Sequence, residues 1–261
     1  MTQSWSFDAP TGAYKNHALS SKIRMAAIAE TKFMQFVRPE DGYGKKKGES
    51  ITITRVSNIA EPTNGRLVEQ VRIPEDTMSI TTVSITIAEW GRAVPFTNFS
   101  QDLAHFNLEN AIQKKLKEQM KLVMDAAAAA AFKTAKVCAI PDGVSSIVFD
   151  TDGTPSTTAT VGVGVYHIEQ IRDYMFGTLK VPPVSGDDYI CICTTKFKRS
   201  LVGDPSWEKW HTYTDPKSKY NSEVGRIENI RFIETNNFNA LSNGVGTGSV
   251  LGEAIIFGDD A

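Results

Sequence analysis

Alternating apolar and polar positions mark two short strands in the first third of the chain. Ile51 and Ile53 alternate with threonines, and the same period of two returns between Val83 and Ile87. Prolines and an Asn-Gly pair separate the two runs, and these residues are turn signals. The pattern predicts a long two-stranded arm. Because an isolated ribbon is marginally stable in water, the arm needs a partner surface in this chain or in a neighbour.

A second pattern, with apolar residues at spacings of three and four, predicts one long helix from Leu103 to Lys136. No Gly or Pro interrupts it, and Asn98 or Ser100 is placed to cap its start. At the α-helical rise the helix would be about 50 Å long. We interpret its apolar stripe as a face packed against a core, formed by Leu108, Ile112, Leu116, Met120, Val123 and Ala127.

Shorter patterns complete the assignment and predict an α+β protein. The predicted shorter helices are Leu19 to Val37, which ends at Pro39, then His167 to Leu179 and Lys196 to Leu201. The predicted strands are Val144 to Phe149, Tyr189 to Thr194, Arg226 to Glu234 and Val250 to Phe257. We expect irregular structure in an N-terminal arm (1–18), a basic turn (Gly42 to Ser50), an aromatic loop (Trp207 to Tyr220) and a mobile Asn/Gly-rich loop (Asn236 to Gly248).

Composition narrows the possible functions. The chain has 261 residues, enough to bury a substantial core, and its formal net charge is -2. This charge gives no sign of a protein that binds nucleic acid by neutralising phosphates. The N-terminus lacks the apolar region of a signal peptide, and no apolar run is long enough to span a membrane. Three cysteines, an odd and sparse count, favour a reducing compartment over a disulfide framework.

The most specific chemical motif is the stretch after a short apolar run, where Asp150 and Asp152 precede Gly153. This motif resembles the nucleophile loop of haloacid-dehalogenase phosphatases, in which the first Asp attacks phosphorus and the second is the acid/base, with magnesium bound nearby. In that family, however, the motif comes near the start of the catalytic domain. A strand that ends in an Asp-Gly turn explains the same residues without catalysis. We favour the turn and expect no enzyme activity.

Other candidate sites are weaker. Cys191 and Cys193 share one face of a strand, but a metal site needs more ligands and the four histidines are scattered, so we expect them to pack in the core. The glycine and serine motifs of nucleotide-binding and hydrolase sites are absent. The lysine run 45–47 is either a solvated turn or a contact with an acidic neighbour. The aromatic residues of the loop, Trp207, Trp210, Tyr213 and Tyr220, are either a small core or a subunit contact.

The C-terminal third resembles the core of tailed-bacteriophage major capsid proteins, whose fold is shared with herpesviruses and encapsulins. The matching motifs are Gly186-Asp187-Asp188-Tyr189, the Lys-containing helix from Lys198 to Pro205, the aromatic loop, Gly225 to Thr235, and the final EAIIFGDDA. The detailed match covers about residues 160–261, and upstream only the order of elements agrees. Members of that group usually continue past the last strand, whereas this chain stops at Ala261.

This resemblance implies a phage major capsid fold with five parts. They are an N-terminal arm and short helix (1–40), an extended β-hairpin loop (41–97), a peripheral domain with a long spine helix and sheet (98–160), an axial domain (161–224), and return strands (225–261). By the same resemblance, the hairpin loop would lie over a neighbouring subunit, and the axial domains would meet around the centre of a capsomer.

The function implied is a structural protein that self-assembles as hexamers and pentamers into an icosahedral head around double-stranded DNA. The implied place is the virion, after assembly in the host cytoplasm. Expected partners are further copies of the chain, a separate scaffolding protein, portal and decoration proteins, and DNA held without sequence-specific contact. We expect no membrane association, and no cofactor, metal or catalytic residue. The alternatives are an encapsulin-like nanocompartment shell and, with less support, the phosphatase that uses Asp150 and Asp152.

Overall fold

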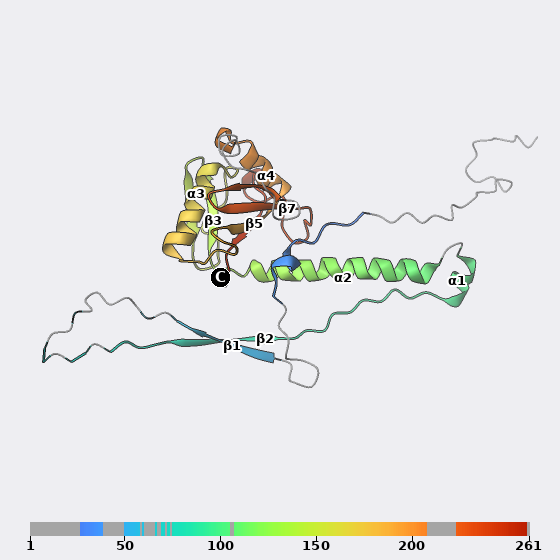
Figure 1. The fold of residues 1–261 in the computed structure, drawn as a ribbon. Helices are drawn as coiled ribbons and strands as arrows, with labels where there is room; N and C mark the ends of the chain where they lie inside the picture. Colours follow the sequence, from blue (N-terminus) through green and yellow to red (C-terminus); the bar gives the residue numbers. More distant parts are fainter. Residues whose placement is uncertain are drawn as a thin grey trace, which may run out of the picture. The chain divides into compact units, whose positions relative to one another are not determined.

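The computed structural model describes residues 27–38, 50–57, 59, 66, 69–70, 72–73, 75–104, 107–207 and 223–259. The chain divides into two compact units, one formed by Arg38–Ala93 and the other by Met1–Val37 with Val94–Ala261. Figure 1 shows their elements. Among the described residues, no helix has both the length and the apolar character that crossing a bilayer requires.

The smaller unit contains the predicted two-stranded arm. Strand β1 (Ser50–Val56) pairs antiparallel with β2 (Ile80–Thr86) without a register shift. Ile51 lies opposite Ile85, and Ile53 opposite Val83. Because side chains alternate across a strand, these four residues share one face of the ribbon. The prediction of the arm is confirmed.

A mixed four-stranded sheet forms the centre of the larger unit, in the order β6-β7-β5-β8. Its strands are β5 (Tyr189–Thr194), β6 (Glu223–Ile227), β7 (Ile230–Thr235) and β8 (Ala254–Phe257). Strand β5 is parallel to β7 and antiparallel to β8. Every residue of β5 is buried, as its continuous apolar sequence predicts.

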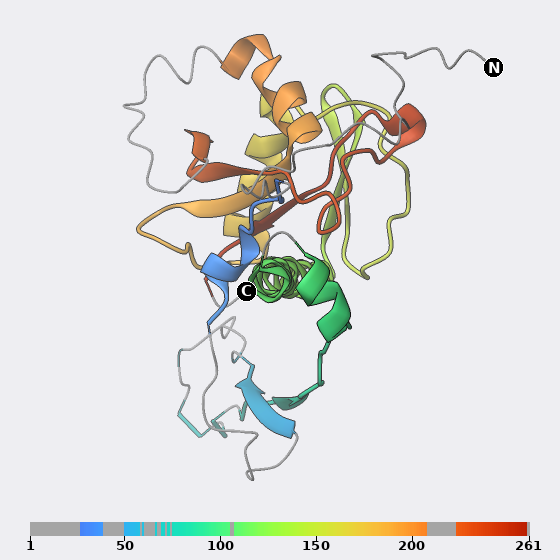
Figure 2. The ribbon, with the colours of Figure 1, turned by 90° about the vertical axis from the view of Figure 1, so that its right-hand side faces the viewer.

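The two faces of this sheet belong to two separate cores. Tyr189, Cys191 and Cys193 pack with α3 (Val165–Asp173) and α4 (Thr195–Val202). Ile190 and Ile192 pack on the other face against the C-terminal half of α2 (Leu108–Phe132). Figure 2 looks along the axis of α2 and shows it below the sheet. The central strand is therefore sandwiched between helices, which explains why none of its side chains reaches solvent.

Two helix predictions need correction. The long helix is shorter than expected, because α1 (Asn98–Leu103) ends and α2 begins afresh at Leu108. Its N-cap is Asn107, whose side chain accepts a hydrogen bond from the Asn110 backbone at 3.0 Å. With 25 residues, α2 is about 37 Å long. The helix predicted at His167 to Leu179 is present as α3 followed by a π-helical turn (Tyr174–Thr178).

The prediction of a first helix is wrong for the residues that the structure describes. Ala27 to Lys32 is not helical, and only a short 3-10 turn, η1 (Phe33–Phe36), follows. The reason is that its backbone amides bind elsewhere: Glu30 N–H donates to Asn236 Oδ1 at 2.8 Å, and Phe33 N–H donates to Asp125 Oδ1 at 2.8 Å. Residues 19–26 lie outside the described part of the chain.

Three strand predictions also change. The strand expected at Val144 to Phe149 is β4 (Ser146–Asp150), and it pairs with an unpredicted β3 (Cys138–Gly143). The single strand expected at Arg226 to Glu234 is the hairpin β6–β7, with Glu228 and Asn229 in left-handed conformation (φ 45° and 61°) at its turn. The last strand is limited to β8, after a short 3-10 turn, η3 (Thr247–Ser249).

The Asn/Gly-rich loop after β7 is packed rather than solvated. Asn237, Ala240 and Leu241 are buried, and Leu241 belongs to the core on the α2 side. The expectation of a loose loop here is wrong because its asparagines have partners inside the protein.

Candidate assembly surfaces

The arm has one apolar and one hydroxyl-rich face. Ile51, Ile53, Val83 and Ile85 form the first, which we call the apolar arm face. The pairs Thr52–Ser84 and Thr54–Thr82 form most of the second. Val83 is 61% exposed, and Ile53 and Ile85 are exposed as well. An exposed ribbon with one apolar face is therefore a candidate interaction surface.

Helix α2 also exposes apolar side chains, contrary to the expectation that its stripe packs on a core. Its buried residues are Asp125 and Ala129, whereas Met120 is 63% exposed and Met124 44% exposed. Leu108, Ile112 and Leu116 are half-buried. The N-terminal half of α2 runs clear of the sheet and of α3 and α4 (Figure 1). Met120 and Met124 are exposed because they lie on the side of the helix that faces away from the buried Ala129.

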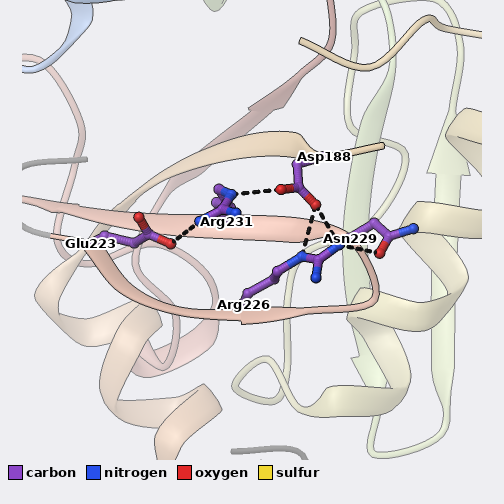
Figure 3. Close-up of polar contacts among 5 residues, drawn as sticks. All are labelled: Asp188, Glu223, Arg226, Asn229 and Arg231. Atoms are coloured by element: carbon purple, nitrogen blue, oxygen red, sulfur yellow. Dashed lines mark hydrogen bonds and ion pairs between the residues drawn. The ribbon is translucent and has the colours of Figure 1, made fainter. Parts of the chain in front are cut away.

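The sheet edge near β6 carries an ion network that the sequence patterns did not reveal (Figure 3). Asp188 accepts hydrogen bonds from Arg226 Nε at 2.7 Å and from Arg231 Nε at 2.6 Å. Arg231 also donates to Glu223 at 2.8 Å, and Arg226 to Asn229 at 2.8 Å. Burial works to lower the pKa of Arg231, but the hydrogen bonds to Asp188 and Glu223 outweigh it and raise that pKa. The network fixes the hairpin to the start of β5.

A second buried polar cluster joins three distant segments. Asp125 is fully buried within α2, and it accepts from the Phe33 backbone and from Asn237 Nδ2 at 3.0 Å. Phe33 itself is fully buried against α2, with its ring centroid 5.9 Å from that of Phe132. No sequence signal distinguishes Asp125 from a solvated helix residue, because its partners lie 92 and 112 positions away.

The proposed phosphatase residues form an ordinary turn. Asp150 accepts from the backbone and the hydroxyl of Ser156, each at 2.7 Å, and Asp152 accepts from Thr154 N–H at 2.8 Å. The Ser156 bonds lower the pKa of Asp150. Strand β4, which precedes them, belongs to a two-stranded antiparallel hairpin. In the described part of the chain, no group of three or more His, Cys, Asp or Glu residues is placed to hold a metal ion.

The remaining candidates lie in the core or outside the described residues. Cys191 and Cys193 are buried free thiols, as predicted, and burial followed by the neighbouring Cys193 raises the pKa of Cys191. His167 is buried and joins α3 to the β3–β4 hairpin through Nε2 and Gly143 O, 2.9 Å apart. Trp207 is buried, with its ring centroid 6.0 Å from that of Phe232. The lysine run 45–47, Trp210, Tyr213 and Tyr220 fall outside the described residues.

Sequence comparison and structural comparison give different results. No family model and no curated protein matches this sequence. Among solved structures, the capsid of Ralstonia phage GP4 has a TM-score of 0.63 at 14% identity, covering 98% of this chain and 82% of that chain. The Cyanophage Pam1 capsid has a TM-score of 0.60 at 14% identity, over 93% and 80%. The capsid of Cyanophage P-SCSP1u has a TM-score of 0.57 at 12% identity, over 85% and 68%. The α+β fold class is confirmed, and this chain has the fold of bacteriophage capsid proteins.

Proposed function

We propose that this chain is the major capsid protein of a tailed bacteriophage. In this proposal it assembles as hexamers and pentamers into an icosahedral shell around double-stranded DNA, and it acts in the virion. The observation that carries the proposal is the exposed apolar arm face, on a chain whose fold is that of phage capsid proteins. An arm of this kind gains stability only when another surface covers it.

The partner of the apolar arm face is then a second copy of the chain. A shell repeats one subunit many times, so each copy donates an arm and receives one, and the many contacts together give a stable assembly. In the same proposal, α2 is the spine of a peripheral domain, and the α/β unit of β5, α3 and α4 is the axial domain at the capsomer centre. Scaffolding, portal and decoration proteins are further partners in this proposal.

Electron microscopy of the purified full chain in negative stain, together with light scattering, tests the proposal. We expect closed shells, tubes or capsomer rings. A chain that stays monomeric when its concentration is raised and crowding agents are added would contradict it.

Paired variants test the role of the arm. Ile53→Thr with Val83→Thr makes the apolar arm face polar while keeping β-branched side chains. We expect this double variant to stop at small oligomers or monomers. Thr54→Ser with Thr82→Ser changes an opposing pair on the hydroxyl face and should assemble like the unmodified chain. If both double variants assemble equally well, the apolar arm face is not needed for assembly and its proposed role is wrong.

A further inference from the structure

The side of α2 that faces away from the sheet presents an apolar seam that the described part of the chain leaves largely exposed. Met120 and Ala129 are nine residues apart, which is two and a half helical turns, so they lie on opposite sides of the helix. Ala129 is fully buried on the sheet side, and Met120 is largely exposed. We define the outer seam as the six residues on that exposed side: Leu116, Met120, Val123, Met124, Ala127 and Ala130.

The spacing of the outer seam suits a helical partner. Leu116, Met120, Val123, Ala127 and Ala130 follow spacings of four, three, four and three, the repeat by which one helix packs along another. The alanines at the C-terminal end of the seam have small side chains, so the backbone of a second helix can approach closely. The methionines at its centre are flexible and adapt to the partner's side chains.

An open, mostly apolar groove adjoins the seam. It has a volume of about 350 Å³ and lies between Val94 and the N-terminal half of α2. Ile112 and Leu116 line it, so the groove joins the seam at Leu116. A partner side chain placed here would extend the apolar contact beyond the seam.

The charged residues along one edge of the seam indicate the sign of the partner's charge. Lys117 and Lys121 are exposed, one turn apart, and next to Met120 and Met124 around the helix. Neither lysine forms an ion pair within the part of the chain that the structure describes. The nearby Glu118 forms an ion pair with Lys115, with 2.7 Å between Glu118 Oε2 and Lys115 Nζ. An acidic partner would therefore be attracted to this edge, and a basic one repelled.

The arm of another copy fits this edge poorly. Arg55 lies on the same side of the ribbon as Ile51 and Ile53, opposite Thr81. An arm docked on the seam would bring Arg55 towards Lys117 and Lys121. We propose that the outer seam of α2 binds an amphipathic helix of a separate, acidic protein. The inference deepens the proposed function by giving the chemistry of one assembly partner, but it does not depend on shell formation and can fail separately.

The test uses two synthetic peptides of three heptads and the full-length protein. The first peptide has leucine at positions a and d and glutamate at e and g, where like charges keep it from pairing with itself. The second has lysine in place of glutamate. Fluorescence anisotropy of each labelled peptide measures binding. We expect the acidic peptide to bind at least about tenfold more tightly than the basic one.

Two sets of variants assign the binding to the seam. Lys117→Glu with Lys121→Glu should reverse the preference, so that the basic peptide binds more tightly. Lys136→Glu with Arg199→Glu makes the same change in net charge at exposed positions away from the seam, and it should leave the preference unchanged. Met120→Gln with Met124→Gln should weaken the acidic peptide about tenfold, because it removes the apolar contact.

Four results would overturn the inference. They are no binding of the acidic peptide to the full chain, equal binding of both peptides, and a preference that the lysine variants leave unchanged. The fourth is a disulfide that forms between Met120→Cys and Ile53→Cys, because the arm would then occupy the seam. Duplex DNA is a further probe. If DNA binds, the lysine variants alone abolish this binding, and neither peptide binds, then the surface binds nucleic acid and the inference is wrong.

Discussion

Arg226 and Arg231 lie directly opposite each other on neighbouring strands of the β6–β7 hairpin, and both donate to the same carboxylate, Asp188. Two like charges facing each other across a hairpin are unfavourable on their own. Here Asp188 lies between them, with Glu223 as a second acceptor for Arg231. The parallel pairing of β5 with β7 joins the hairpin to β5, and the shared carboxylate adds to this contact while it offsets the repulsion between the two arginines.

Replacement of Asp188 by Asn should destabilise the protein. It removes the negative charge and one of the two acceptor oxygens that the two partly buried guanidinium groups share. We expect a loss of about 2–3 kcal/mol, less than for a fully buried pair because Arg226 is partly exposed. Urea denaturation followed by circular dichroism measures the loss. Asp187→Asn, at the exposed neighbouring position, is the matched control and should change stability by less than about 0.5 kcal/mol. Similar effects of the two variants would contradict the assigned role.

Replacement of Asp125 by Ala should be more damaging than its position in a helix suggests. The change leaves the buried Phe33 N–H and the Asn237 amide without an acceptor, at a cost of about 1–3 kcal/mol for each group. Thermal unfolding of Asp125→Ala, Asn237→Ala and the double variant measures the coupling. We expect the double variant to lose clearly less than the sum of the single losses. Additive losses would show that Asp125 and Asn237 act independently.

Gly252 is required by a close approach between the loop before β8 and the start of α4. A Cβ at this position would lie 2.0 Å from Thr194 Oγ1 and 2.9 Å from Phe197 N. Gly252→Ala should therefore lower the midpoint of thermal unfolding, because the clash involves backbone as well as a side chain. Gly177→Ala is the control, since nothing lies within 4 Å of its Cβ position, and it should be neutral or slightly stabilising. Equal midpoints for the two variants would contradict the prediction.

Glu169 should make the protein less stable at neutral pH than a neutral residue would. Burial, followed by the negative charges of Glu228, Asp173 and Asp204, raises the pKa of Glu169 above its usual 4.5. A raised carboxyl pKa means that the folded state favours the protonated form, so its destabilising effect appears as the pH rises above about 4.5. Glu169→Gln should raise the free energy of unfolding at pH 7. Near pH 3 the difference from the unmodified chain should vanish, and a gain that persists there would have another cause.

Local patterns predicted the elements whose side chains alternate regularly or are all buried. The alternation at Ile51 and Ile53 predicted the arm, and the unbroken apolar run at Tyr189 predicted the central strand. The missed strand β3 contains Pro141, and β6 contains Gly225. Both residues weaken a strand signal, so only pairing with a neighbouring strand reveals these segments.

The orientation of α2 could not be read from its apolar pattern. Apolar residues were expected to face the core, yet the core side of the helix has Asp125 and Ala129. Asp125 is tolerated there because residues far along the chain satisfy it, and Ala129 because a small side chain lets the helix approach the sheet. The exposed apolar side of α2 follows from this arrangement. Which molecule covers it cannot be predicted from the sequence, because that depends on a surface outside this chain.

The C-terminal half of α2 packs against the sheet, whereas its N-terminal half does not. The helix can therefore be compared to a lever. Its fixed point is near Asp125, and its N-terminal end at Leu108 is 17 residues away, a distance of about 25 Å. A small tilt at the fixed point is thereby converted into a larger displacement at the far end. In the proposed shell, which curves differently at its vertices and on its faces, a tilt of this kind would place neighbouring subunits at different angles without repacking the core.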